Sequence, residues 1–259
     1  MKLFLALALS YTGFVASQTL VLATPAPLSS ARSTATLAQT APSSWPQPPS
    51  DDPPGGRVRG GARRDTCSSA NPTLTALVPF TEDVSKRVTN VWGLTIETNP
   101  TLWFYVPYAN NSAYATEFVL QDQQRNPIYQ KAIALPERPG VIGISLPANA
   151  LQLTVDKQYR WFLNVNCKQQ QPSPPIYVEG VIKRVNLNQA ITKQLKTATP
   201  LQQFAIYAQN GIWHEALTTL AQLRQKNPQD EALEAEWRKL LASISLDDVV
   251  TKPILPGKL

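Results

Sequence analysis

The chain has 259 residues with a formal net charge of +6, and it contains 23 prolines, two cysteines and one histidine. Its lysines and arginines are interspersed with acidic residues rather than gathered in one stripe, which argues against a nucleic-acid binder. One histidine and two cysteines do not make a usual zinc site. No Walker or dinucleotide glycine pattern is present, so we expect no metal and no cofactor.

Residues 1–38 have the features of an export leader. Lys2 is followed by an apolar run over residues 3–9, and no acidic residue precedes Asp51, a combination typical of a signal peptide. The run is too short and too interrupted for a good membrane span. Small residues leave the cleavage site open between residues 17 and 38. We therefore expect an exported protein, periplasmic or extracellular, with no stable membrane span in its mature part.

Residues 39–66 are rich in proline, glycine and arginine and show no hydrophobic periodicity, which predicts a disordered tail. Within this tail, residues 57–64 hold four arginines and resemble an arginine–glycine nucleic-acid segment. The export leader argues against nucleic acid as the partner. Two interpretations stay open: a solvated tether, and a segment weakly attracted to acidic polysaccharides or lipid head groups.

Residues 67–185 predict a β-domain. Eight short runs rich in β-branched and aromatic residues are separated by proline, glycine, asparagine or aspartate, which indicates an immunoglobulin-like antiparallel β-sandwich. The expected strands are 74–79, 91–96, 102–107, 117–120, 128–135, 141–146, 159–167 and 176–185.

The two cysteines, Cys67 and Cys167, stand at the start of this domain and at the end of its seventh expected strand. An even number of cysteines in an exported chain favours a disulfide. Joining them closes a loop of about 100 residues, which stabilises a fold by roughly 4–5 kcal/mol. Two buried free thiols are the alternative.

The stretch 153–161 resembles the tyrosine corner of immunoglobulin-like sandwiches, in which a tyrosine near the start of a strand bonds to the upstream backbone. Tyr159 is that residue here. The alternation from Tyr159 to Cys167 also places five apolar residues on one face of the strand.

The densest aromatic group lies between residues 103 and 114. Aromatic faces can stack on sugar rings or anchor a protein interface, which makes Trp103, Tyr105 and Tyr108 the candidate binding residues. Because consecutive strand residues point to opposite faces, only about half of the group can share one surface. The alternative is that these side chains fill the core between the sheets.

From residue 186 the apolar period becomes helical, and we expect a helical module over 186–246 and a C-terminal tail over 247–259. Thr199, Pro200 and Gln202 have the pattern of a helix start with a capping box. Residues 207–228 resemble the second half of one tetratricopeptide repeat, through Gly211 and Trp213 among others. A single repeat cannot bury its own face, so we expect the helices to pack on the sandwich or on each other.

Catalytic chemistry has little support among the residues. His214 is the only histidine, and the sequence contains no nucleophile-elbow motif whose serine it could activate. We interpret it as a surface residue of a helix. Glu179 is an acid inside an apolar strand and could form a hydrolase-type carboxylate pair with Glu97 or Glu117. An outward-facing strand acid is the alternative. We assign no catalytic residue.

A set of segments carries a family resemblance: the arginine–glycine run before Cys67, residues 74–79, 101–108, 159–162, Cys167, 178–180, 207–208 and 211–217. Through them the chain resembles a cyanobacterial family of exported proteins classed as domain of unknown function 928. The resemblance covers nearly everything after the leader. It implies a cyanobacterial origin and export, and it carries no activity.

The residues thus predict an exported, non-enzymatic protein of the cell envelope. It would bind a protein or a glycan through its sandwich, its helical module or the seam between them. The alternatives are a hydrolase of envelope polymers that uses strand-borne carboxylates, and a structural or assembly factor. A concave pocket with two close acids favours the hydrolase. An exposed apolar patch on the helices favours an interaction role.

Overall fold

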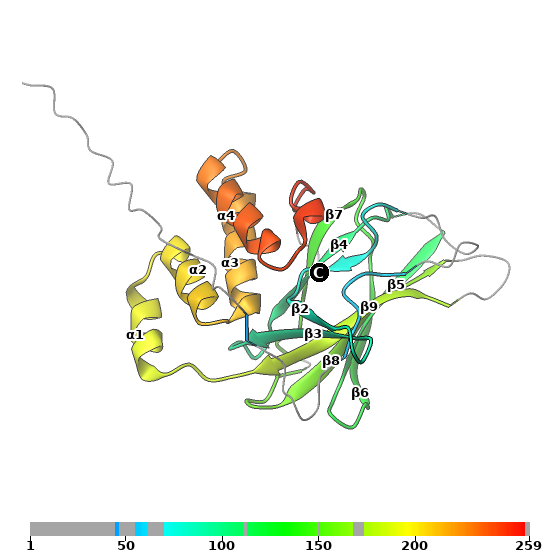
Figure 1. The fold of residues 1–259 in the computed structure, drawn as a ribbon, viewed down its shortest axis with the longest axis horizontal. Coiled ribbons are helices and arrows are strands. Elements are labelled where there is room, and N and C mark those ends of the chain that lie inside the picture. The colour runs from blue at the N-terminus through cyan, green and yellow to red at the C-terminus, as the bar shows by residue number, and fades with distance from the viewer. Residues whose placement is uncertain are drawn as a thin grey trace, which may run out of the picture. The chain divides into compact units, whose positions relative to one another are not determined.

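The computed structural model describes residues 45–46, 55–61, 70–110, 113–149, 151–167 and 174–256, and within these ranges nine strands form two sheets that four α-helices follow (Figure 1). All of these residues belong to one compact unit, residues 37–259. The class of the fold is therefore β-structure followed by α-structure, as predicted. Among the helices described, none combines the length and the apolar composition needed to cross a membrane.

The larger sheet is mostly antiparallel, and its one parallel pair joins β3 to β9. Those two strands are far apart in sequence, so no hairpin connection forces them to be antiparallel. The strand order is β2 (Phe80–Asp83), β3 (Val88–Thr95), β9 (Ile176–Arg184), β8 (Gln158–Cys167), β5 (Tyr114–Gln121) and β6 (Pro127–Ile133). β2 was not predicted, because its sequence has no apolar alternation and its strand character comes from pairing with β3.

The smaller sheet has β4 (Thr101–Val106) between β1 (Thr75–Ala76) and β7 (Gly140–Ser145). Phe104 of β4 faces the larger sheet, where its ring lies 5.5 Å from that of Trp161. Trp103 points to the opposite side, and its indole N–H donates to Thr218 Oγ1 of the helices at 2.9 Å. The smaller sheet is therefore a middle layer covered on both faces, which explains its unbroken run of apolar residues.

Four helices follow the strands: α1 (Gln189–Thr197), α2 (Pro200–Gln209), α3 (Trp213–Lys226) and α4 (Glu231–Ala242). The predicted start of α2 is confirmed, with the Thr199 side chain and the Gln202 side chain forming a reciprocal capping box and Pro200 in the first turn. A 3₁₀ turn, η1 (Asp247–Val249), comes after α4.

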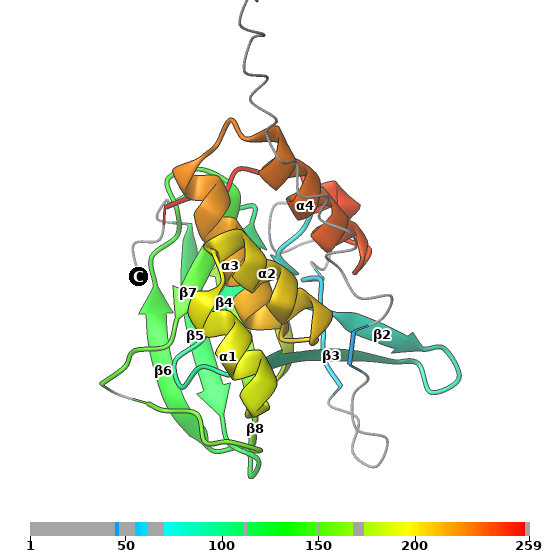
Figure 2. The ribbon, with the colours of Figure 1, turned by 90° about the vertical axis from the view of Figure 1, so that its left-hand side faces the viewer.

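The helices dock on the sheets through α3 and also pack on each other, so both predicted packings are confirmed. The indole N–H of Trp213, the first residue of α3, donates to the carbonyl of Leu77 at 2.8 Å in a buried position. In the side view, the helices lie over the strands while the β2–β3 hairpin projects away from them (Figure 2). The join between the sheets and the helices is thus part of the hydrophobic core.

Within β8 the predicted alternation is confirmed: Tyr159, Trp161, Leu163 and Val165 are buried, and the residues between them are partly exposed. The Tyr159 hydroxyl accepts a hydrogen bond from the backbone N–H of Thr154 at 3.0 Å, the contact that the tyrosine-corner pattern predicts. β8 ends at Cys167. No cysteine among the described residues is a free thiol, but Cys67 lies outside those residues, so the Cys67–Cys167 pairing stays a prediction.

Part of the segment predicted as a disordered tail lies against the folded core. Arg57 exchanges two backbone hydrogen bonds with Glu179 of β9, at 2.8 and 2.9 Å. Three residues later, Gly60 N–H donates to the carbonyl of Leu74, next to β1. Residues 55–60 therefore connect the two sheets. Their sequence does not reveal this, because backbone groups make these contacts and no apolar alternation is required.

The C-terminal residues 247–256 are also not a free tail, contrary to expectation. Val249, Val250 and Leu255 are buried, and Val141 of β7 exchanges backbone hydrogen bonds with Pro253 and Leu255. This short segment lacks the periodicity of a helix or a strand, which is why its packing was missed.

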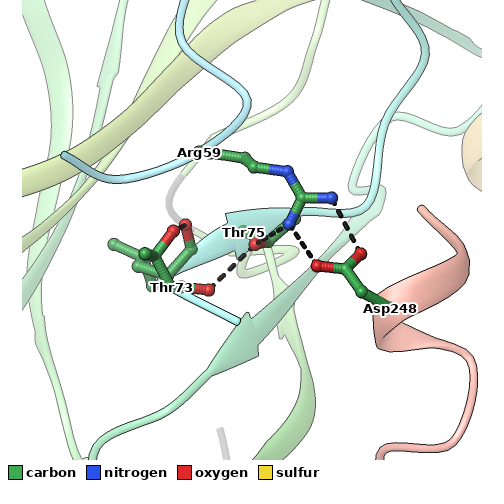
Figure 3. Close-up of polar contacts among 5 residues, drawn as sticks. Arg59, Thr73, Thr75 and Asp248 are labelled. Carbon is green, nitrogen blue, oxygen red and sulfur yellow. Dashed lines mark hydrogen bonds and ion pairs between the residues drawn. The ribbon is translucent and has the colours of Figure 1, made fainter. Parts of the chain in front are cut away.

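One ion pair joins the two ends of the described chain. The Arg59 guanidinium donates two hydrogen bonds, at 2.8 and 2.9 Å, to the two carboxylate oxygens of Asp248, and a third to Thr75 Oγ1 (Figure 3). Both charged side chains are partly exposed, at 35% and 45%. The pair therefore contributes at most about 1 kcal/mol to stability, but it fixes the position of Arg59.

Candidate functional site

The three candidate binding aromatics lie in the interior. Trp103, Tyr105 and Tyr108 are only 6%, 4% and 5% exposed. Burial, with a smaller contribution from Tyr114, raises the pKa of Tyr108 to about 12. The residues therefore support the core-filling alternative, because the helices and the C-terminal segment cover the face of β4 that would otherwise be open.

His214 is buried, so its interpretation as a surface residue is wrong. It lies against Gly93 of β3, and neither of its ring nitrogens has a hydrogen-bonding partner among the described residues. Burial lowers the pKa of His214 to about 3, and the nearby backbone of Thr101 offsets this only in part. The imidazole is thus neutral. Within the described ranges, no three metal-ligating side chains gather in one place.

The carboxylates proposed for a hydrolase are not brought together. Glu179 pairs with Arg160 at 3.9 Å, while Glu117 accepts from the Gln130 amide at 2.7 Å. The strand register sets Glu117 and Glu179 two strands and two residues apart, which corresponds to about 12 Å between their backbones. Paired glycosidase carboxyl groups lie about 5–9.5 Å apart.

Glu97 is further away from Glu179. It follows β3, whose Thr95 is opposite Arg184, five residues along β9 from Glu179. That offset is about 17 Å along the strand. The strand-borne carboxylate pair therefore has no geometric basis among these residues.

Glu215 is a buried acid that sequence reasoning missed. Its carboxylate accepts hydrogen bonds from the Thr95 hydroxyl and from the backbone N–H of Ile96. Burial raises the pKa of Glu215 to about 7, although the Thr95 hydrogen bond opposes the shift. Both carboxylate oxygens accept hydrogen bonds that join α3 to the end of β3, so we assign Glu215 a structural role. Its position in the helix between Trp213 and Ala216, which are both buried, was the feature of the sequence that could have indicated its burial.

A pocket of about 230 Å³ opens at the seam between the strands and the helices, and we call it the seam pocket. Three aromatic residues and four neutral polar residues make up most of its lining, and no charged side chain is among the described residues that line it. They are Trp45, Phe80, Trp92, Thr81, Asn90, Ser243 and Ser245. Its walls come from β2, β3, the turn after α4 and the segment at Trp45.

Among the described side chains that line the seam pocket, Trp92 carries the one polar group that is buried and unpaired. Its side chain is 6% exposed, and its indole N–H has no hydrogen-bonding partner among the described residues. Buried N–H groups are almost always paired in folded proteins, and an unpaired one costs about 1–3 kcal/mol. Because this nitrogen is shielded from solvent, a ligand with an acceptor atom would recover that energy only if the indole or its neighbours shift to admit the acceptor.

Trp45 and Pro46 also line the seam pocket. Trp45 packs edge-on against Trp213, with ring centroids 4.6 Å apart, and its indole N–H donates to Ser243 Oγ at 3.1 Å. Pro46 covers Gly211, where an added Cβ would lie 2.4 Å from the proline ring. Gly211 also has a φ of +71°, so both its conformation and its neighbour require glycine.

A family model described as Domain of Unknown Function (DUF928) matches residues 59–254. The chain belongs to this family. No curated protein matches it. The DUF928 region contains every strand and helix described above, but it begins after Trp45 and Pro46. The family domain therefore supplies Phe80, Trp92 and Ser243 to the seam pocket, and an N-terminal extension supplies the remaining aromatic wall.

Proposed function

We propose that this DUF928 protein is an exported, non-enzymatic binding protein of the cell envelope that holds part of a glycan in the seam pocket. The indole N–H of Trp92 carries the proposal, because it belongs to a residue that lines the pocket and has no hydrogen-bond acceptor among the described residues. The pocket lies at the seam between strands and helices, one of the three locations that the sequence leaves open for binding, beside the sandwich and the helical module.

The chemistry of the lining favours a sugar ring. Trp45, Phe80 and Trp92 offer flat apolar faces, and Asn90, Ser243 and Ser245 offer neutral donors and acceptors. A pyranose presents the matching pair, an apolar face and a rim of hydroxyl groups. At about 230 Å³ the pocket is below the range of about 300–1,000 Å³ for drug-sized ligands, so it suits one ring of a longer chain.

We also propose that the two sheets form an immunoglobulin-like sandwich and that α2 and α3 form a tetratricopeptide-like hairpin. The bond between Tyr159 and the Thr154 backbone supports the first, and the tight Gly211 turn before Trp213 supports the second. The sheets already cover the buried face of α3. A peptide groove of the multi-repeat kind is therefore not part of the proposal.

Replacing Trp92 with phenylalanine tests the function. The variant keeps an aromatic ring but removes the N–H, so its stability should be unchanged or slightly raised while its affinity for a glycan falls roughly 3- to 10-fold. The assay is a glycan array with the purified mature protein, followed by calorimetry on the best ligand. Trp237→Phe is the matched control, because its N–H is equally unpaired but lies in α4, away from the pocket.

Three results would count against glycan binding at this site. They are the absence of any retained glycan, an unchanged affinity of Trp92→Phe, and an equal loss in Trp237→Phe. Hydrolysis of a retained glycan would instead favour the envelope hydrolase. Capture of a protein partner without any glycan would favour an assembly factor.

The export part of the proposal has its own test. Expressed with its leader, the protein should be recovered outside the cytoplasm with a mass that places the cleavage between residues 17 and 38. The same mass spectrum, taken before and after alkylation without reduction, should show both Cys67 and Cys167 protected if they are paired. An uncleaved cytoplasmic protein would refute export, and two alkylated thiols would refute the disulfide.

A further inference from the structure

A second concave surface lies beside the seam pocket, and we call it the arginine groove. It has a volume of about 580 Å³, and it runs between residues 56–59 and the β2–β3 hairpin. Three arginines line it, Arg57, Arg59 and Arg87, together with one acid, Glu82. Phe80 lines both the arginine groove and the seam pocket, so the two sites are neighbours.

Arg57 is held in place without being neutralised. Its backbone pairs with Glu179, and its guanidinium lies over the ring of Tyr177, 4.7 Å from the centroid. Among the ion pairs of the described residues, none involves Arg57, and the residue is exposed. A guanidinium stacked on an aromatic face keeps its N–H groups at the edge available for a planar anion.

The other two arginines differ from each other. Asp248 already neutralises the charge of Arg59, so Arg59 helps to shape the groove but adds no net positive charge to it (Figure 3). Arg87 is exposed, has a φ of +54° in the hairpin turn, and makes no ion pair among the described residues, whereas its neighbour Lys86 pairs with Asp83. Among the described residues that line it, the groove therefore offers two guanidinium groups without an ion pair, Arg57 and Arg87, and one carboxylate, Glu82.

We infer that the arginine groove binds the anionic groups of an acidic polysaccharide, carboxylate, sulfate or phosphate, while a neighbouring ring of the same chain enters the seam pocket. The inference rests on the proposed function, because it takes the ligand to be a glycan. It goes further by specifying that this glycan is negatively charged. Arginine suits this task because its planar fork of donors matches an oxyanion.

A lipid surface fits the same charges less well. The large hydrophobic side chains that are exposed among the described residues are Val84 and Val88, both near the end of the β2–β3 hairpin. Two valines bury little apolar area in a bilayer, and membrane-surface binding depends on such area as well as on charge. The concave form of both sites also suits a chain better than a plane.

The test compares acidic oligosaccharides, carrying uronate, sulfate or phosphate groups, with uncharged oligosaccharides of the same length. We expect the mature protein to prefer an acidic member, and this preference to shrink when salt is raised from about 0.05 M to about 0.5 M. Arg57→Gln and Arg87→Gln should each weaken that binding roughly 3- to 10-fold. Arg138→Gln, which removes an exposed charge before β7, should not change it.

The outcomes separate this inference from the proposed function. If neutral members bind as tightly as acidic ones, or if both groove variants bind like the parent protein, the inference fails, and sensitivity to Trp92→Phe still supports the seam pocket. If no acidic member is retained, or anionic vesicles bind more tightly than every oligosaccharide, the inference also fails. If the groove variants weaken binding and Trp92→Phe does not, binding of the anionic groups in the arginine groove stands, but the seam pocket and the placement of the neighbouring ring in it are refuted. Thermal unfolding of each variant confirms that it is folded.

Discussion

Replacing Trp213 with alanine is expected to lower the free energy of unfolding by about 3–5 kcal/mol, the usual effect of truncating a buried tryptophan. Trp213 is fully buried at the start of α3, where it joins the helices to the sheets. The substitution removes the hydrogen bond to the Leu77 carbonyl and the edge-on contact with Trp45. Urea denaturation followed by circular dichroism measures the change.

Trp213→Phe separates the ring from the hydrogen bond. The phenylalanine keeps most of the apolar contact but leaves the buried Leu77 carbonyl without this donor, which costs about 1–3 kcal/mol. The alanine variant should also bind glycan more weakly than the phenylalanine variant, because Trp45 loses its support and forms a wall of the seam pocket. An effect of Trp213→Ala no larger than that of a surface substitution would contradict docking of α3 through this residue.

The pH dependence of stability is the second large expected effect, because two buried titratable residues act in opposite directions. The folded pKa of Glu215, about 7, is above its ordinary value of 4.5, so its contribution to stability is complete below pH 4.5 and is lost as the pH rises through 7. The folded pKa of His214, about 3, is below its ordinary value of 6.5. Its contribution is complete above pH 6.5 and is lost as the pH falls toward 3.

Each group changes the free energy of unfolding by about 1.4 kcal/mol per pH unit within its own window. Between pH 4.5 and 6.5 the two slopes oppose one another, so these residues should leave the stability nearly flat there. Each of the two effects amounts to a few kcal/mol in total, because both side chains are almost fully buried.

Single substitutions should uncover the two slopes. Glu215→Gln removes the loss of stability that titration of Glu215 causes as the pH rises. The free energy of unfolding of this variant should therefore rise from about pH 3 to 6.5 and then level off. His214→Gln removes the gain of stability that titration of His214 causes as the pH rises. The free energy of unfolding of this variant should therefore fall between about pH 4.5 and 7. Urea titrations across this range, with each variant subtracted from the parent protein, isolate the two residues from other titrating groups. Difference curves that are flat across both windows would show that neither residue titrates as its burial requires.

The sequence predicts a structural feature when the residues that form it lie close together in the chain. The capping box at Thr199 and Gln202 depends on residues three positions apart, and the alternation in β8 depends on the period of a single strand. The bond from the Thr154 backbone to Tyr159 spans five residues. These features need no knowledge of the distant chain.

What was missed depends on contacts between distant segments. Trp103 and Tyr105 are buried because α3 and the C-terminal residues cover the second face of β4. The sequence of β4 does not indicate that other segments pack on this face. His214 and Glu215 lie in the join between α3 and β3 for the same reason. The seam pocket combines residues from near positions 45, 80, 92 and 243, which only the assembled fold brings together.

The backbone pairing of Arg57 with Glu179 bears on how shortened forms of this protein should be cut. The family region begins at residue 59, so a protein trimmed to that boundary would lack both Arg57 and Gly55. The N–H and carbonyl of Glu179 and the N–H of Val91 would then lose their partners. These unpaired groups on the neighbouring interior strands β3 and β9 would destabilise the sheet, because exposed backbone donors and acceptors left without partners cost free energy and can pair with other molecules. A soluble shortened form should therefore begin before Gly55.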